Sequence, residues 1–291
     1  MFTRKPSVLA AQALCVAALA TVVASATPAS AQTVVPCSAN ALSTAIGNAN
    51  TSGGGTLVLA RGCIYSLMTE LPHIQSTITI VGRNTTITRD PSAANNFGIL
   101  SVDSIGNLTL TNTTITKGVA SDFGGGIANR GRLTVTGSDI SGNSANFSGG
   151  IGGSSGTVTR IVNSSITGNT ANVNGGGVAN DGDMTIVNTR ITGNTANNGV
   201  GGGLANDGTL RLVNTDVTLN HALGNRAGGI ANVGGGTTNI TASNINNNTA
   251  AVAPGGILNS GGSVTLTASR VRNNTPTNCT GSDITIPNCV G

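Results

Sequence analysis

The feature that most constrains the fold is a recurrence of aliphatic residues at intervals of about 25 to 28 residues. The anchors of this repeat are Ile87, Ile115, Ile140, Ile166, Ile191, Val217, Ile245 and Val271. A second aliphatic residue stands five residues before each of the last seven anchors, and Ser or Thr stands two residues before every anchor. Such short apolar and polar alternation is typical of strands with one buried face. The repeat predicts about eight equivalent coils.

Polar and small residues recur where the expected strands must be joined. An Asn follows most anchors by three residues, as at Asn143, Asn169 and Asn194, and an Ala commonly follows two residues later. A glycine-rich segment then leads into a third strand, as in residues 124–129 and 175–180. Stacked Asn side chains can hydrogen-bond to their counterparts in neighbouring coils, which explains them without catalysis. The glycines do not predict a nucleotide site, because no GKS or GKT sequence and no helix follow them.

Three short strands per coil cannot bury their apolar faces alone, whereas stacked coils bury one continuous column. The sequence therefore predicts an all-β fold, a single-stranded right-handed parallel β-helix, with the hand that parallel connections favour. Because a solenoid exposes strand edges at both ends, we expect covers there. At the first end, Ser38 is placed to cap a helix with a buried face formed by Leu42, Ala45, Ile46 and Ala49.

Four cysteines follow Ala31, one pair at each end of the repeats: Cys37, Cys63, Cys279 and Cys289. In an oxidising compartment the economical pairing joins Cys37 to Cys63 and Cys279 to Cys289, although four cysteines allow three connectivities. The lack of a CxxC motif or a neighbouring His argues against a metal site at these cysteines. The expected organisation is a signal peptide at 1–31, an N-terminal cap at 32–75, β-helix repeats at 76–274 and a disulfide-closed C-terminal cap at 275–291.

The segment 1–31 has the pattern of a secretory signal peptide. Arg4 and Lys5 precede an apolar run over residues 8–26, and Ala29, Ser30 and Ala31 form a cleavage pattern. A membrane anchor is the alternative, but polar residues interrupt the run and no basic cluster follows it. We expect a monomer that is secreted, extracellular or cell-wall associated, with no transmembrane span after cleavage. Removal of Arg4 and Lys5 lowers the formal charge of +4 by two, and nothing indicates a nucleic-acid partner.

Two recurring elements resemble those of bacterial secreted right-handed β-helix repeat proteins. One is three glycines followed by an aliphatic residue, Ala and Asn, and the other is an aliphatic residue followed at intervals by Asn and Ala. Both are similar to the repeats of polymorphic outer-membrane proteins within the pectate-lyase-like superfamily, over residues 124–274. Ile or Val replaces the Phe of those repeats. The resemblance implies a β-helix, and it implies a role as an adhesin, an autotransporter passenger or a polysaccharide-cleaving enzyme.

The best candidate site among ten acidic residues is the cluster of Asp181, Asp183 and Asp207. Asp181 and Asp207 occupy the same position in successive coils, and Asp183 lies two residues along. Carboxylates in such a cluster could bind Ca²⁺ or act as general acid and base. The alternative is structural, because Asn-Asp-Gly is a favourable turn sequence. No catalytic residue and no cofactor other than Ca²⁺ is predicted.

Aromatic residues that could stack on sugars are scarce, namely Tyr65, Phe97, Phe123 and Phe147 after the signal peptide. We therefore do not expect a loop that combines an acid, a base and an aromatic platform. The sequence favours a non-catalytic, adhesin-like surface protein that presents a polar face to an extracellular glycan or a surface protein. The alternative is a polysaccharide lyase or glycoside hydrolase that uses the acidic cluster.

Overall fold

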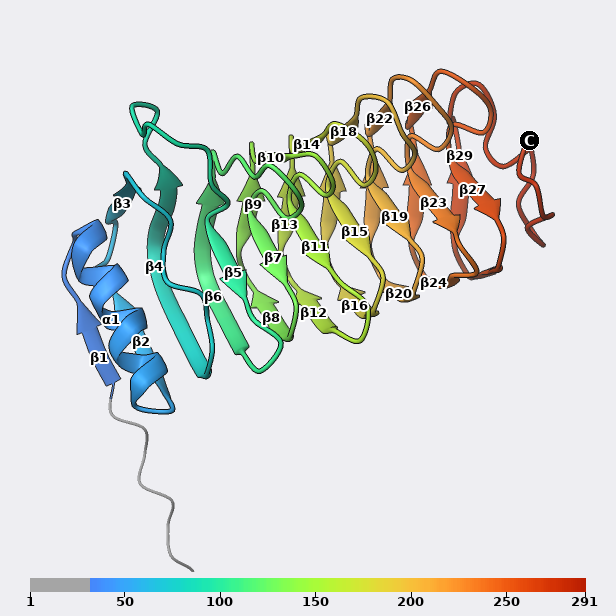
Figure 1. Cartoon of the computed structure of the whole chain (residues 1–291). Coiled ribbons are helices and arrows are strands. Elements are labelled where there is room, and N and C mark those ends of the chain that lie inside the picture. Colours follow the sequence, from blue (N-terminus) through green and yellow to red (C-terminus); the bar gives the residue numbers. More distant parts are fainter. Residues whose placement is uncertain (1–31) are drawn as a thin grey trace, which may run out of the picture. The chain divides into compact units, whose positions relative to one another are not determined.

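The computed structural model describes residues 32–291, so the predicted signal peptide at 1–31 lies outside the described residues. One helix stands near the start of the described part, and almost every other element is a short parallel strand. The strands stack side by side from one end of the repeats to the other (Figure 1). They form a parallel β-solenoid of about nine turns, which confirms the predicted fold class. No helix within residues 32–291 is long and apolar enough to cross a membrane.

The largest sheet has 17 strands and contains the anchor column. Its strands are β1 Gln32–Val35, β2 Gly54–Leu59, β3 Ile64–Leu67, β4 Thr77–Arg89, β6 Asn107–Thr116, β8 Arg132–Thr136, β9 Asp139–Ser141, β12 Val158–Val162, β13 Ser165–Thr167, β16 Asp183–Val187, β17 Arg190–Thr192, β20 Thr209–Val213, β21 Asp216–Thr218, β24 Thr237–Thr241, β25 Asn244–Asn246, β28 Ser263–Thr267 and β29 Arg270–Arg272. From β8 onward each coil contributes two of these strands, separated by a bend.

Two smaller sheets complete each coil. The seven-stranded sheet consists of β5 Leu100–Val102, β7 Ile127–Asn129, β11 Ile151–Gly153, β15 Val178–Asn180, β19 Leu204–Asn206, β23 Ile230–Val233 and β27 Ile257–Ser260. The five-stranded sheet consists of β10 Ser144–Ala145, β14 Thr170–Ala171, β18 Thr195–Ala196, β22 His221–Ala222 and β26 Thr249–Ala250. The alanines, predicted to lie at corners, therefore pair in short strands, where their small side chains stack close to the core.

The anchors lie in register along one column. Ile140 pairs with Ile115 on one side and with Ile166 on the other, and all three side chains are fully buried. The column also extends one coil further toward the N-terminus than the aliphatic repeat indicates. Tyr65 in β3 pairs with Ile87, and its buried hydroxyl donates a hydrogen bond of 2.9 Å to the Val35 carbonyl oxygen. A strand over residues 55–60 was expected to begin the stack, as β2 does, but Tyr65 was not counted as an anchor because it is an aromatic residue.

Two ladders of Asn side chains run through the stack. In the predicted ladder, Asn169 Nδ2 donates to Asn194 Oδ1 over 3.0 Å and to the Ile140 carbonyl oxygen over 2.8 Å. A second ladder lies at the ends of the seven-stranded sheet, where Asn180 Nδ2 donates to Asn206 Oδ1 over 2.8 Å. These side chains are buried, so each ladder satisfies polar groups that the fold removes from water. The bends of the 17-stranded sheet use left-handed residues instead, mostly Asn, with φ of 49° at Asn188.

The N-terminal end is covered by helix α1, Ala39–Thr51, which buries the four predicted residues. Figure 1 shows α1 beside β1 and β2. A disulfide joins Cys37 to Cys63. Ser38 occupies the N-cap position, but its side chain makes no capping hydrogen bond, so the capping role was wrong. The disulfide lies directly before the helix and attaches the first turn of the helix to the first coil.

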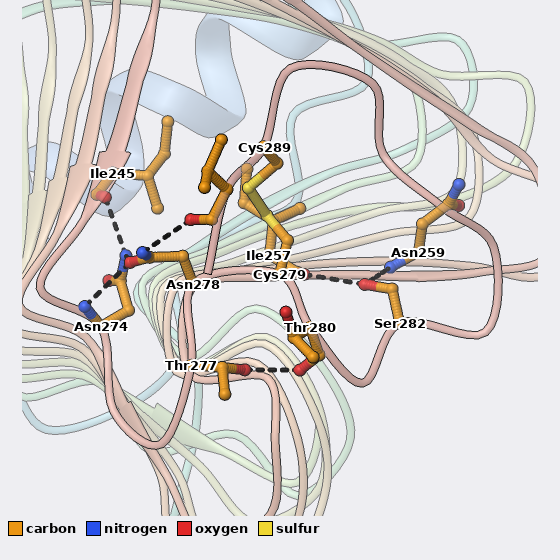
Figure 2. Close-up of a disulfide and its surroundings, with 11 residues drawn as sticks. Ile245, Ile257, Asn259, Asn274, Thr277, Asn278, Cys279, Thr280, Ser282 and Cys289 are labelled. Atoms are coloured by element: carbon orange, nitrogen blue, oxygen red, sulfur yellow. Dashed lines mark hydrogen bonds between the residues drawn. A yellow bond between two sulfur atoms is a disulfide. The ribbon is translucent and has the colours of Figure 1, made fainter.

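The second predicted disulfide, Cys279 to Cys289, closes the C-terminal segment (Figure 2). This segment ends the predicted Asn ladder and also contacts the backbone of the last Asn in the second ladder. Asn278 Oδ1 accepts from Asn274 Nδ2 over 3.0 Å, in place of the next ladder Asn. Ser282 Oγ accepts from the Asn259 backbone N–H over 3.2 Å. The last coil therefore presents few unsatisfied polar groups at this end of the stack.

Candidate functional site

A groove runs along the outer face of the seven-stranded sheet. In each strand the first and third residues point into the core, so the middle residue faces outward. The middle residues pair in register and form the floor of the groove: Ala128, Gly152, Ala179 and Ala205. Because these residues are so small, a ligand could approach the backbone of the sheet closely. The central hollow of the groove has a volume of about 380 Å³.

One wall of the central hollow comes from the loops that precede β7, β11 and β15. It carries Asp122, Phe123, Phe147 and Asn174. Phe123 and Phe147 pair as neighbours in a parallel bridge, and the Phe147 N–H donates to the Asp122 carbonyl oxygen over 2.7 Å. Phe147 lies in a loop outside the strands, and 38% of it is exposed. The loops thus place two aromatic side chains on adjacent coils, the platform that the sequence did not predict.

The opposite wall is formed by residues that directly follow the strands, namely Ser154, Asp181 and Asp207. The Asp181 N–H donates to the Gly153 carbonyl oxygen, and the Asp207 N–H donates to the Asn180 carbonyl oxygen, each over 2.8 Å. The two aspartates stand on coils whose strands lie about 4.8 Å apart. Two of the three predicted acidic residues therefore share the hollow, and Asp122 joins them from the other wall.

Asp183 does not line the central hollow. It begins β16 in the 17-stranded sheet, where it is exposed and pairs with Val158 and Thr209. The chain turns at Gly182, which separates Asp181 and Asp183 onto different faces of the coil. The candidate acidic set in the groove is Asp122, Asp181 and Asp207.

The electrostatics of the central hollow are dominated by negative charge. Burial raises the pKa of Asp181, and the neighbouring Asp207 raises it further. No Lys, Arg or His side chain lines this hollow. Two carboxylates about 5 Å apart in partly solvated surroundings repel each other by about 1 to 3 kcal/mol. The hollow therefore favours a ligand that brings a positive charge or donates hydrogen bonds.

The groove continues toward the N-terminus in a second hollow of about 290 Å³, which shares Asp122 and Phe123 with the first. The Arg130 guanidinium lies over the Phe123 ring, 4.5 Å from its centroid, a cation–π contact. His73 Nδ1 lies 2.9 Å from Asp103 Oδ1. Toward the C-terminus the same face carries an apolar cluster of Ala227, Ala231, Leu258, Val200 and Val233.

Metal binding was predicted as an option for the acidic residues. Within residues 32–291, no group of three or more His, Cys, Asp or Glu side chains is arranged to hold a metal ion. Ca²⁺ takes six to eight oxygen ligands, of which Asp181 and Asp207 would provide only part. Ca²⁺ binding stays a prediction.

Comparison of the sequence with protein-family models and with curated proteins finds no match. The resemblance of the repeat elements to β-helix proteins is supported by the structure, and only as far as the β-solenoid fold. The function has to be argued from the groove itself.

Proposed function

We propose that this protein is an extracellular, non-catalytic glycan-binding protein and that the groove on the seven-stranded sheet is its binding site. The observation that carries the proposal is that two aromatic and three acidic side chains line one hollow, namely Phe123, Phe147, Asp122, Asp181 and Asp207. A sugar ring has apolar faces and a rim of hydroxyl groups. Aromatic side chains pack against such faces, and carboxylates accept hydrogen bonds from such rims.

The setting of the hollow supports this proposal. Its volume of about 380 Å³ falls in the usual range for small-ligand sites. Its floor belongs to a parallel sheet whose later strands are joined by a buried Asn ladder, and its walls are loops on that support. The two disulfides fit an extracellular location, where glycans are available.

The test is a glycan array followed by titration calorimetry with the best ligand. Removal of one ring, in Phe147→Ala, should weaken binding by about ten-fold, which corresponds to about 1.4 kcal/mol. The matched control is Leu223→Ala, which removes an exposed apolar side chain that does not line the central hollow. Absence of binding to every glycan on the array, or equal affinity of both variants, would refute the proposal.

A second candidate function, glycoside hydrolysis, is favoured by the raised pKa of Asp181 beside Asp207. A carboxyl group whose pKa is raised, next to a second carboxylate, is the arrangement that a general acid and its partner require. Reducing-end release from the bound glycan would detect turnover. If the protein is an enzyme, Asp181→Asn and Asp207→Asn should each lower turnover by about 100-fold or more, whereas Asp183→Asn should not. No release from any bound glycan would eliminate this candidate.

A further inference from the structure

One coil at the centre of the groove departs from its neighbours in two places. The residue that begins the turn into the seven-stranded sheet is Gly124 in the coil before it and Gly175 and Gly201 in the two coils after it, with φ between 68° and 73°. Here it is Ser148, with φ of 47°. The floor residue is Ala in the adjacent coils but Gly152 here. A residue with a side chain is strained in this left-handed conformation. Ala227 adopts it at the same position three coils later, with φ of 63°, but Ala has no polar group to satisfy there, whereas Ser148 has a hydroxyl.

The two departures are physically coupled. A Cβ atom on Gly152 would lie 2.5 Å from Ser148 Oγ and 2.5 Å from a Phe123 ring carbon. Ser148 and Phe123 therefore occupy the space that an Ala side chain would need at this floor position, and only glycine fits beneath them. The Ser148 hydroxyl consequently lies against the groove floor beside the aromatic wall.

The Ser148 hydroxyl has no hydrogen-bond partner. Among residues 32–291 it is the buried side-chain oxygen or nitrogen that remains unsatisfied, and the residue is fully buried. Buried hydroxyl groups in folded proteins almost always find a partner. Because Ser148 lines the central hollow, a ligand there can supply the missing hydrogen bond.

The carboxylates of the hollow also lack partners of opposite charge. In the described part of the chain, the ion pairs join His73 to Glu70 and Asp103, and Arg226 to Asp283. None of them involves Asp122, Asp181 or Asp207. A polyuronate chain would add further negative charge to this hollow and would be repelled, whereas an ammonium group would be attracted.

We propose that the groove binds a glycan with free amino groups, a de-N-acetylated amino-sugar chain, through an ammonium group at Asp181 and Asp207 and a ring hydroxyl at Ser148. This inference rests on the proposed glycan-binding function and specifies its ligand class. The exposed Phe147 ring packs against a ring face of the sugar, and Phe123, which is covered on one face by Arg130, borders the same hollow. The ammonium group relieves the repulsion between the two aspartates, and the sugar hydroxyl satisfies Ser148 Oγ.

The test compares three oligosaccharides of equal length by titration calorimetry at about pH 6, where amines remain protonated. These are oligomers of glucosamine, N-acetylglucosamine and galacturonate. The glucosamine oligomer should bind at least about ten-fold more tightly than either of the others. Asp181→Asn and Asp207→Asn should each remove this preference, whereas Asp183→Asn, which alters an exposed carboxylate outside the hollow, should keep it.

The Ser148→Gly variant tests the hydroxyl separately. It introduces the residue that neighbouring coils carry at this left-handed position, so it should fold at least as stably as the natural protein. Its affinity for the glucosamine oligomer should fall about three- to ten-fold, the usual effect of one lost hydrogen bond. Unchanged affinity, with the fold verified by circular dichroism, would overturn the role of Ser148.

The outcomes separate this inference from the function on which it rests. If the N-acetylated oligomer binds as tightly as the free amine, and Phe147→Ala weakens both, the protein binds glycans but the amino-sugar selectivity is wrong. If no oligosaccharide binds and oligolysine does, the groove accepts basic peptides, and both proposals fail.

Discussion

Replacement of Asn194 by Ala would test how much the buried Asn ladder contributes to stability. Asn194 is fully buried, and its Nδ2 donates to the Ile166 carbonyl oxygen over 2.9 Å and to Asn220 Oδ1 over 3.0 Å. Its Oδ1 accepts from the backbone N–H of Asn169 over 2.9 Å and from Asn169 Nδ2 over 3.0 Å. The change would therefore break four hydrogen bonds in the interior of the stack.

The cost follows from the groups left behind. Without Asn194 Oδ1, two buried donors of Asn169 lose their acceptor. Each buried polar group left unsatisfied costs about 1 to 3 kcal/mol, so we expect Asn194→Ala to lower the free energy of unfolding by about 3 to 5 kcal/mol. Because folded domains are typically stable by only about 5 to 15 kcal/mol, such a loss is large.

The assay is urea denaturation, combined with hydrogen exchange at the Asn169 amide. The control lies in the same coil, where Asn188 belongs to an exposed row and has a φ of 49°. Asn188→Gly keeps that backbone conformation and should cost less than about 1 kcal/mol. Equal losses in the two variants, or unchanged exchange at Asn169, would show that burial of the ladder does not determine its contribution.

Two further predictions concern acidic groups. Because burial and Asp207 raise the pKa of Asp181, its ionised form disfavours the folded state above that pKa. Asp181→Asn should therefore stabilise the protein at neutral pH, by up to about 1 kcal/mol after solvent screening, and the gain should vanish below the ordinary pKa of 3.8. The measurement is scanning calorimetry of both proteins over this pH range. A difference in stability between them that does not change with pH would contradict this expectation. Hydrogen bonds from Arg226 and Ser260 lower the pKa of Asp283 to about 2, so its stabilising contribution is complete above 3.8 and is lost as the pH falls through 2. Exchange of the Ile284 amide, which bonds to the Asn259 carbonyl oxygen, should accelerate over that interval relative to its intrinsic rate, and Asp283→Asn should abolish the step.

The fold was predictable because inward positions repeat the same residue types in every coil. Ile140, Ile166 and Ile191 stack in register as their spacing indicates, although the spacing itself varies. Loops of different length account for the variation in spacing, and the strands keep their register. Tyr65 was not identified as an anchor of the first coil because its phenol fills the same core column with a polar end that needs partners from Ala60 and Val35, a requirement that no spacing reveals.

The candidate site was predictable only where its residues follow the strands directly. Asp181 and Asp207 share a position relative to β15 and β19, so they were paired from the sequence. Phe123 and Phe147 were missed because they lie eight and seven residues after their anchors, on loops of unequal length. Phe123 and Phe147 each lie four residues before the first, inward-facing Ile of the next strand. Counting back from that strand, instead of forward from the anchor, would therefore have identified the aromatic pair.

The coil that contains Ser148 also shows how a repeat protein tolerates a departure from its own pattern. Gly153 in β11 replaces the ladder Asn found in the coils before and after it, which interrupts the second ladder. Asn129 therefore loses its usual acceptor, but the buried Thr159 Oγ1 accepts from Asn129 Nδ2 over 2.9 Å. The buried amide is thus satisfied by a compensating residue, whereas the Ser148 hydroxyl in the same coil is left without a partner. The fold explains why Thr159 accepts a hydrogen bond from Asn129, but it does not explain why the Ser148 hydroxyl has no partner. An unsatisfied buried group at the centre of the groove is expected where a residue serves ligand binding and not stability.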